Sequence, residues 1–219
     1  MLVHKNSQNP LLVVKTLAEK LTDKVIAGIA PSPCDLPAVI FGIDKWLHTL
    51  LFYPENAKLI IKSLSEYFLT ICNQMFENGA TVVLSTIDFS NSSIVTTNIK
   101  EQIVFPILKE TLAQVNGSLV IHHGGPDLAN NLKSFDELPN VLAYVISPED
   151  DFEKSRQQIS KERILLGNYD GPELVNHSVS KIKMKVDRIL EQTKNDRHFI
   201  FGIIKMTDIF FTKTTHWII

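Results

Sequence analysis

The chain has 219 residues, of which 44% are hydrophobic and 21% are charged, enough apolar material for the core of one domain spanning residues 1–219. The formal charge is -2 with no block of like charges, so nucleic acid is not an expected partner. The apolar run Leu11–Val14 is too short for a signal peptide or a membrane span, and the 2 cysteines are too few and too far apart for a disulfide framework. We therefore expect a soluble cytoplasmic protein with reduced thiols.

The first half of the chain alternates between amphipathic helices and short apolar strands. We expect a helix around 11–21, a strand over 24–30, a short helix around 42–52, a long helix over about 55–78, a strand over 81–87 and a helix over about 98–115. Pro54 ends the short helix, and Pro106 kinks or restarts the last one. Strand 81–87 is β-branched and mostly apolar, as parallel strands buried on both faces are.

The second half repeats this alternation. We expect strands at 118–121, 141–146, 163–166 and 198–201, with helices near 128, 151–159 and after Asp170. In the last helix Asp170 caps the N-terminus, Pro172 lies in the first turn, and one stripe is apolar: Val175, Val179, Ile182, Val186 and Ile189. About six βα units follow one another without a linker, which is typical of an α/β fold of the TIM-barrel type, two units short of eight.

Several of the predicted strands end in polar residues, where the active sites of parallel α/β enzymes lie. Asp88 ends a buried strand and is followed by Ser90 and Asn91. The aspartate could act as a general base or hold a substrate amine or pyrrole N–H, with Ser90 and Asn91 beside it as substrate-binding residues. Alternatively it caps the next loop, because Asp, Ser and Asn all favour turns.

Two adjacent histidines, His122 and His123, follow the strand at 118–121. Either could bind zinc or act as an acid or base. Because neighbouring residues of a strand point to opposite faces, only one of them can face a barrel lumen while the other packs outward. They could also be ordinary polar residues at a strand end.

Three further residues are weaker candidates. Asn168 and Asp170 follow the strand at 163–166 and could contact a substrate, although Asp170 is also the expected helix cap. Cys34 lies in a proline-rich loop at the same end of the fold, where a thiol could bind metal or react, whereas Cys72 belongs to an apolar helix stripe and is expected in the core. A glycine-rich phosphate loop, a GxSxG motif and an HExxH motif are all absent from the sequence.

The order and spacing of several short motifs resemble the uroporphyrinogen decarboxylase superfamily. They cover nearly the whole chain from about Lys24: Ala27–Pro33, Phe41–Leu47, Tyr53–Asn56, Asn78–Asp88, Phe105–Pro106, Val120–Gly125, Ile164–Asn168 and Met206–Phe211. The resemblance implies a (β/α)₈ barrel and one of two activities. One branch decarboxylates uroporphyrinogen without a cofactor. The other, the methylcobamide:thiol methyltransferases, moves a methyl group from a corrinoid to coenzyme M or a related thiol.

The methyltransferase branch binds zinc through a His-x-Cys pair and a later cysteine, and the metal holds the thiol as a thiolate. His122 matches the family histidine, but Gly124 and Thr207 stand where the cysteines belong. The decarboxylase branch fits no better, since its serine after the strand-end acid is Phe89 here, and its tyrosine is lost near Val39. The Asp88-x-Ser90 loop and residues 94–97 are closer to the methyltransferases.

The resemblance thus implies a methyltransferase-like enzyme, impaired by the lost cysteines, with Asp88 and His122 as catalytic residues and a corrinoid as substrate. Zinc would be held by His122, with Cys34 or His123 as a substitute ligand, and His123 is also a candidate for binding the substrate. The alternatives are a decarboxylase-like enzyme that acts on a tetrapyrrole, and a non-catalytic protein that binds a corrinoid, a tetrapyrrole or a partner corrinoid protein. Six units leave unpaired strand edges, so we expect a fragment, a homo-oligomer or a partner chain that covers them.

Overall fold

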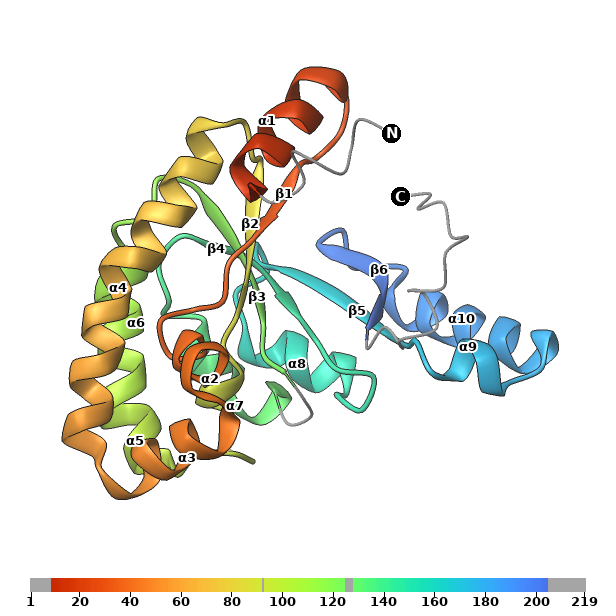
Figure 1. Ribbon diagram of the computed structural model, residues 1–219. Coiled ribbons are helices and arrows are strands. Elements are labelled where there is room, and N and C mark those ends of the chain that lie inside the picture. The colour runs from red at the N-terminus through yellow and green to blue at the C-terminus, as the bar shows by residue number, and fades with distance from the viewer. Residues whose placement is uncertain (1–8, 92, 125–127, 205–219) are drawn as a thin grey trace.

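The computed structural model describes residues 9–91, 93–124 and 128–204, and its centre is a single parallel sheet (Figure 1). Six strands lie in the order β1-β2-β3-β4-β5-β6, each paired in parallel with the next. Their bounds are Ala27–Ile29, Val82–Thr86, Ser118–His122, Val141–Val145, Ile164–Asp170 and Phe199–Ile204. The predicted six-stranded α/β fold is therefore confirmed.

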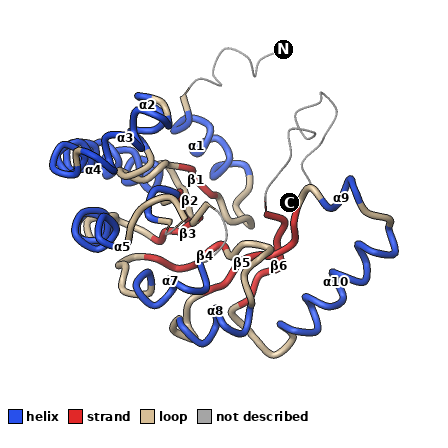
Figure 2. Tube along the Cα trace, turned by 90° about the horizontal axis from the view of Figure 1, so that it is seen from below, coloured by secondary structure: helices blue, strands red, loops and turns tan. Residues whose placement is uncertain are grey.

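The strands form a curved sheet, and the helices that connect them lie along its outer side (Figure 2). The α-helices are α1 Pro10–Lys20, α2 Leu36–Phe41, α3 Ile43–Phe52, α4 Pro54–Glu77, α5 Thr97–Ile99, α6 Phe105–Leu112, α7 Leu128–Phe135, α8 Phe152–Gln158, α9 Glu173–Asn176 and α10 Val179–Thr193. Helix–strand alternation around a curved parallel sheet is the architecture of a TIM barrel, here with six strands. No helix in the described part of the chain is both long and apolar enough to span a bilayer.

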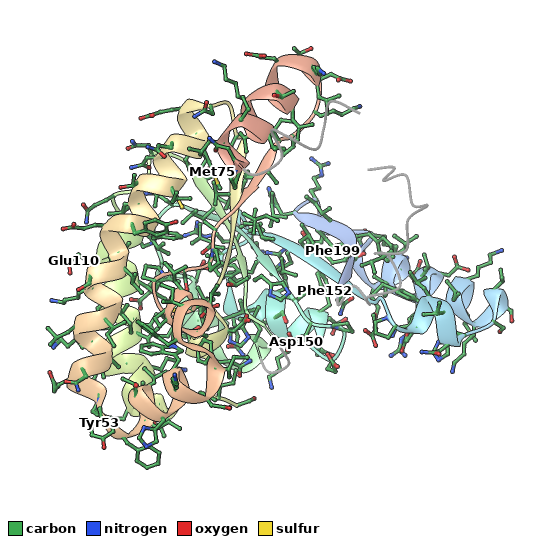
Figure 3. All side chains as sticks on the ribbon, in the orientation of Figure 1. Tyr53, Met75, Glu110, Asp150, Phe152 and Phe199 are labelled. Atoms are coloured by element: carbon green, nitrogen blue, oxygen red, sulfur yellow. The ribbon has the colours of Figure 1, made fainter. Side chains whose placement is uncertain are left out.

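Two apolar clusters stabilise the sheet, one on each face. The larger lies between the sheet and the outer helices, and it includes Phe68 of α4 and Ile121 of β3. At the same layer Gly28 lets β1 approach α4 closely, because an added Cβ would lie 2.5 Å from Sδ of Met75 (Figure 3). The smaller cluster lines the concave face: Val82, Val120, Ala143 and Val145, with Leu84, Ile164 and Leu166 packed against it.

In the first half of the chain, the structure departs from the expected helices in two places. The loop before residue 42 contains the additional helix α2, with Pro37 in its first turn, where proline has no N–H to lose. The helix expected over 98–115 is divided: a π-helical stretch, Lys100–Val104, separates α5 from α6, and Pro106 lies in the first turn of α6. The predicted restart at Pro106 is confirmed.

The expectation for residues after Asp170 is wrong. Strand β5 continues through Asp170, so this residue is not a helix cap, and α9 ends after one turn at Asn176. The longer helix α10 has its own cap, Ser178, whose hydroxyl accepts a hydrogen bond from the Lys181 amide at 3.4 Å. A hydroxyl that accepts a backbone N–H in the first turn fixes the residue at which a helix begins. An apolar stripe does not fix that residue.

The two edge strands of the sheet expose apolar side chains. Within the described residues β1 and β6 each pair on one side only, and Ile29 of β1 is 65% exposed. Ile200 and Ile203 of β6 are also exposed. At the start of β6 the ring of Phe199 packs edge to face at 5.3 Å against that of Phe152, the first residue of α8 (Figure 3).

Candidate functional site

Asp88 and His122 lie together at the carboxyl ends of neighbouring strands. His122 is the last residue of β3, and in the sheet it is level with Thr86, the last residue of β2. Asp88 begins a short 3₁₀ turn, η1 (Asp88–Ser90), just after β2. Nδ1 of His122 is 3.9 Å from Oδ1 of Asp88, and the two side chains are 34% and 41% exposed. This places a carboxylate and an imidazole side by side: both side chains are partly exposed, while the two atoms that face each other are enclosed.

The two adjacent histidines point in opposite directions. His122 lies two residues after Val120, which belongs to the concave cluster, so it faces the same side of the sheet. His123 is buried on the outer side, where its ring meets that of Phe135 edge to face at 5.1 Å. The sequence-predicted division between the two histidines thus places only His122 beside Asp88.

The backbone of the turn that carries Asp88 is held by Asp35, a residue that no sequence pattern marked as part of the site. One carboxylate oxygen of Asp35 accepts a hydrogen bond from the Asp88 amide at 2.8 Å, and the other accepts one from the Phe89 amide at 3.0 Å. Burial, and secondly the negative charge of Asp88, raise the pKa of Asp35 to about 6. The signal available in the sequence was an aspartate in a proline-rich loop at the same end of the sheet.

Cys34, the neighbour of Asp35, belongs to the support of this turn. Its thiol is fully buried, lies 2.9 Å from Oγ of Ser32 and donates weakly to Asp35 at 3.6 Å. The indole of Trp46 donates to the Cys34 carbonyl oxygen at 2.8 Å, which ties the loop to α3. Burial raises the pKa of the Cys34 thiol well above its ordinary value, so the group is a neutral thiol enclosed beside Ser32 and Asp35.

Ser90 and Asn91, predicted to bind substrate, are buried and bond to the backbone around them. The Ser90 hydroxyl donates to the Ile87 carbonyl oxygen at 2.6 Å. The Asn91 side chain accepts from the Ser93 amide at 2.8 Å and donates to the Gly124 carbonyl oxygen at 3.3 Å. These bonds join the loop after β2 to the loop after β3, so both residues shape the surroundings of Asp88.

Gly124 packs directly against the carboxylate of Asp88. Its φ is +68°, a conformation that favours glycine, and a Cβ at this position would lie 1.7 Å from Oδ1 of Asp88. Gly124 occupies the position of the first cysteine in the zinc motif of the methyltransferase branch. The carboxylate of Asp88 therefore fills the space that a side chain at position 124 would need.

Asn168 and Asp170 lie apart from this pair, at the end of β5. The Asn168 amide donates to the carbonyl oxygens of Ser147 and Asp150 at 3.4 and 3.3 Å. Asn168 also lines a cavity of about 750 Å³ between the loop before α8 and the α9–α10 segment. Neither Asp88 nor His122 contributes to the walls of this cavity, so the structure places Asn168 in a second location.

The residues around Asp88 do not fit the zinc site of the methyltransferase branch. Thr207, at the second cysteine position, lies outside the described residues, as does the rest of the Met206–Phe211 motif. In the described ranges no three His, Cys, Asp or Glu side chains are arranged to hold a metal ion. Without a thiolate at position 124, and with Cys34 neutral and bonded to Ser32, His122 has no cysteine partner of the kind that motif requires.

Comparisons with known proteins agree with this architecture. No curated protein matches the sequence. Among solved structures, the fold is similar to that of a methyltransferase from Methanosarcina mazei, with a TM-score of 0.73 at 20% sequence identity. The likeness covers 88% of this chain and 57% of that chain, so this chain spans little more than half the length of that protein.

The sequence itself matches a family model over nearly its whole length. The model is that of uroporphyrinogen decarboxylase, and the match runs from residue 5 to residue 203. It includes the strands that carry Asp88 and His122 and the loop that carries Asp35. This chain belongs to the uroporphyrinogen decarboxylase family, and its six-stranded sheet is a partial TIM barrel.

Proposed function

We propose that this protein is a methyltransferase-like member of its family that transfers a methyl group between a corrinoid and a thiol. The observation that carries the proposal is the approach of Asp88 to His122, 3.9 Å apart at the carboxyl end of the sheet. This is the end at which TIM-barrel enzymes place their reacting groups. The likeness of the fold to a methyltransferase supports the same choice.

His122 would act as the base that prepares the acceptor. A neutral imidazole can take the proton of a bound thiol, and the resulting thiolate is the nucleophile. A methylcorrinoid would supply the methyl group, whose bond to cobalt breaks with both electrons left on the metal as the carbon–sulfur bond forms. The carboxylate of Asp88 would stabilise the protonated imidazole, because opposite charges at this separation attract.

The proposed chemistry assigns to His122 the task that zinc performs in the related enzymes. Zinc there lowers the pKa of the thiol by binding the thiolate. Gly124 and the buried thiol of Cys34 do not fit that site, so no metal step enters the proposal. A proton acceptor next to a carboxylate produces the same thiolate by acid–base chemistry.

The test is methyl transfer from methylcobalamin to 2-mercaptoethanesulfonate, followed by the absorbance of the cobalamin. Wild-type protein should demethylate the donor, and His122→Ala and Asp88→Asn should each slow the reaction at least about a hundredfold, the lower end of general-base contributions. His48→Ala is the control, because His48 lies on α3 and packs against Phe52 and Tyr53. Its rate should equal that of the wild type.

Elemental analysis of the same preparations separates the metal-free mechanism from a remodelled zinc site. We expect activity without stoichiometric zinc, and no change after treatment with a chelator. Zinc bound in the wild type and lost in His122→Ala, together with activity that requires it, would overturn the proposed role of His122 as a base.

A tetrapyrrole substrate is the second candidate, and one observation favours it. The side chain of Asp88 is 41% exposed, and its Oδ1 accepts no hydrogen bond within the described part of the chain. A carboxylate oxygen in this state is suited to accept the N–H of a pyrrole ring. Incubation with uroporphyrinogen and chromatography of the products decides the point: decarboxylated porphyrinogens, with no methyl transfer, would replace the first proposal by this one.

A further inference from the structure

A buried carboxyl group lies immediately behind the proposed site. Asp35, at the N-terminus of α2, is only 5% exposed, yet both of its oxygens accept hydrogen bonds from the backbone of the turn that carries Asp88. An aspartate that accepts two amides of one turn fixes that turn in orientation as well as in position. The side chain of Thr86, the last residue of β2, donates a further bond to Asp35.

Each element packed around Asp35 contributes an identifiable group. Its own loop places the Cys34 thiol 3.6 Å from one oxygen. Strand β2 contributes the Thr86 hydroxyl, and the turn after it contributes the second carboxylate, Asp88. Within the described residues Asp35 forms no ion pair with a lysine, arginine or histidine, so backbone amides and hydroxyl groups are what hold its charge.

We propose that Asp35 is a positioning residue that holds Asp88 in place against His122. The proposal deepens the function proposed above and rests on it for its catalytic consequence. Gly124 limits the movement of the Asp88 carboxylate on one side, while the two amide bonds to Asp35 fix the backbone on the other. Asp88 can face His122 only while the turn keeps this orientation. The loop after β1 therefore supports a site built on β2 and β3.

The structural part of the proposal is tested by NMR, without any substrate. Burial and the charge of Asp88 raise the pKa of Asp35 to about 6. The side-chain carboxyl carbon of ¹³C-labelled Asp35 should therefore titrate near that pH, and the Asp88 and Phe89 amide protons should shift with the same midpoint. In Asp88→Asn the midpoint should move down, because one of the causes that raise it is removed.

Asp150 provides a matched control, since it is also buried and also accepts a backbone amide, that of Ser147 at 2.9 Å. Asp150→Asn should leave the titration of the Asp88 and Phe89 amides unchanged, whereas Asp35→Asn should abolish it. Amides at positions 88 and 89 that do not follow the ionisation of Asp35 would overturn the inference. This result stands whether or not methyl transfer is observed.

Kinetics then separate positioning from mere stabilisation. Asp35→Asn should lower kcat about tenfold with little change in KM, and the double variant with Asp88→Asn should be no slower than Asp88→Asn alone, because residues that act as a unit are not additive. Asp150→Asn should keep the wild-type kcat. Equal kcat values for Asp35→Asn and the wild type, with Asp88→Asn slow, would refute the positioning role. An inactive wild type would instead refute the proposed function and leave the NMR result to decide the role of Asp35.

Discussion

The region around α4, β2 and β3 and the region around α9 and α10 both begin from amphipathic sequences, but the first packs its apolar stripe along the sheet, whereas the second leaves the start of its stripe exposed. On α4, Phe68 and Met75 are nearly inaccessible to solvent because the helix lies along the sheet. At the other end of the chain Val175 is exposed and Val179 is 83% exposed, and α9 and α10 extend to the side of the sheet (Figure 1). An apolar stripe thus predicts a helix, while its burial depends on what the chain places beside it.

The difference matters for function because the proposed site stands on the well-packed region. Asp88 follows β2 and His122 ends β3, and the outer faces of both strands pack in one apolar cluster with α4 and α6. Rigid support of this kind is what keeps two side chains within reach of each other. The cavity beside α10 has no such cover, and its walls include the exposed side chain of Met184.

The largest predicted effect comes from removing a side chain in the packed region. Phe68→Ala should lower the free energy of unfolding by about 3–5 kcal/mol, the usual cost of a phenylalanine cavity in a core. Phe68 is 1% exposed, so water does not reach the cavity that the missing ring would leave. Denaturant unfolding at constant pH measures the change. A loss below about 1 kcal/mol would show that α4 does not pack on the sheet as described.

The next effect concerns Gly124 and the carboxylate it touches. Gly124→Ala should cost about 3–4 kcal/mol, because it combines a left-handed backbone with an overlap against Asp88. Gly42→Ala is the control, since Gly42 has a φ of +89° but nothing within 4 Å of an added Cβ. Its ψ of 150° lies in a region that is essentially restricted to glycine, so that variant should cost about 1–3 kcal/mol from the backbone alone. A loss of only about 1–2 kcal/mol in Gly124→Ala, the cost of a left-handed backbone alone, would mean that the contact with Asp88 carries no energy.

The contrast between Asp88 and Asp35 shows which residues of the candidate site could be predicted from the sequence. The end of a β-branched strand predicted where Asp88 lies, and the alternation of strand residues predicted that one of the two histidines faces the concave side. Asp35 follows no strand pattern. Its importance arises from a contact between residues more than 50 positions apart, which periodicity does not encode.

Asp170 and Gly124 mark two further limits. An aspartate before a proline is a good helix cap on propensity, but at Asp170 pairing with β6 extends β5 through this residue, and tertiary pairing overrides a local preference. Gly124 could be identified as a missing cysteine by comparison with the family. The missing side chain at position 124 leaves room for the Asp88 carboxylate. This follows from a φ angle and a distance, which only the structure supplies.

The buried carboxyl group of Asp35 predicts an unusual dependence of stability on pH. Between about pH 4 and pH 6 the folded protein keeps the Asp35 proton while the unfolded chain releases it, so this group makes the free energy of unfolding fall as the pH rises. The contribution amounts to up to about 3 kcal/mol over the window. Unfolding curves of the wild type and Asp35→Asn at several pH values measure it. The variant should lack this part of the decline, and identical pH profiles would contradict the assignment.

The smallest effect on the free energy of unfolding is expected on α10, the less covered of the two regions compared above. Val179→Ser should change the free energy of unfolding by less than about 0.5 kcal/mol, because the side chain already lies in solvent. Ile189→Ser on the same helix is the matched control: Ile189 is buried, so its replacement by a polar side chain should cost several times more. If Val179→Ser were as damaging as Ile189→Ser, the start of α10 would have to be covered in solution, either by residues outside the described ranges or by a second chain. A negligible loss would instead mean that only the last turns of α10 are anchored, and that an apolar residue at a helical position contributes to stability only where another element lies against it.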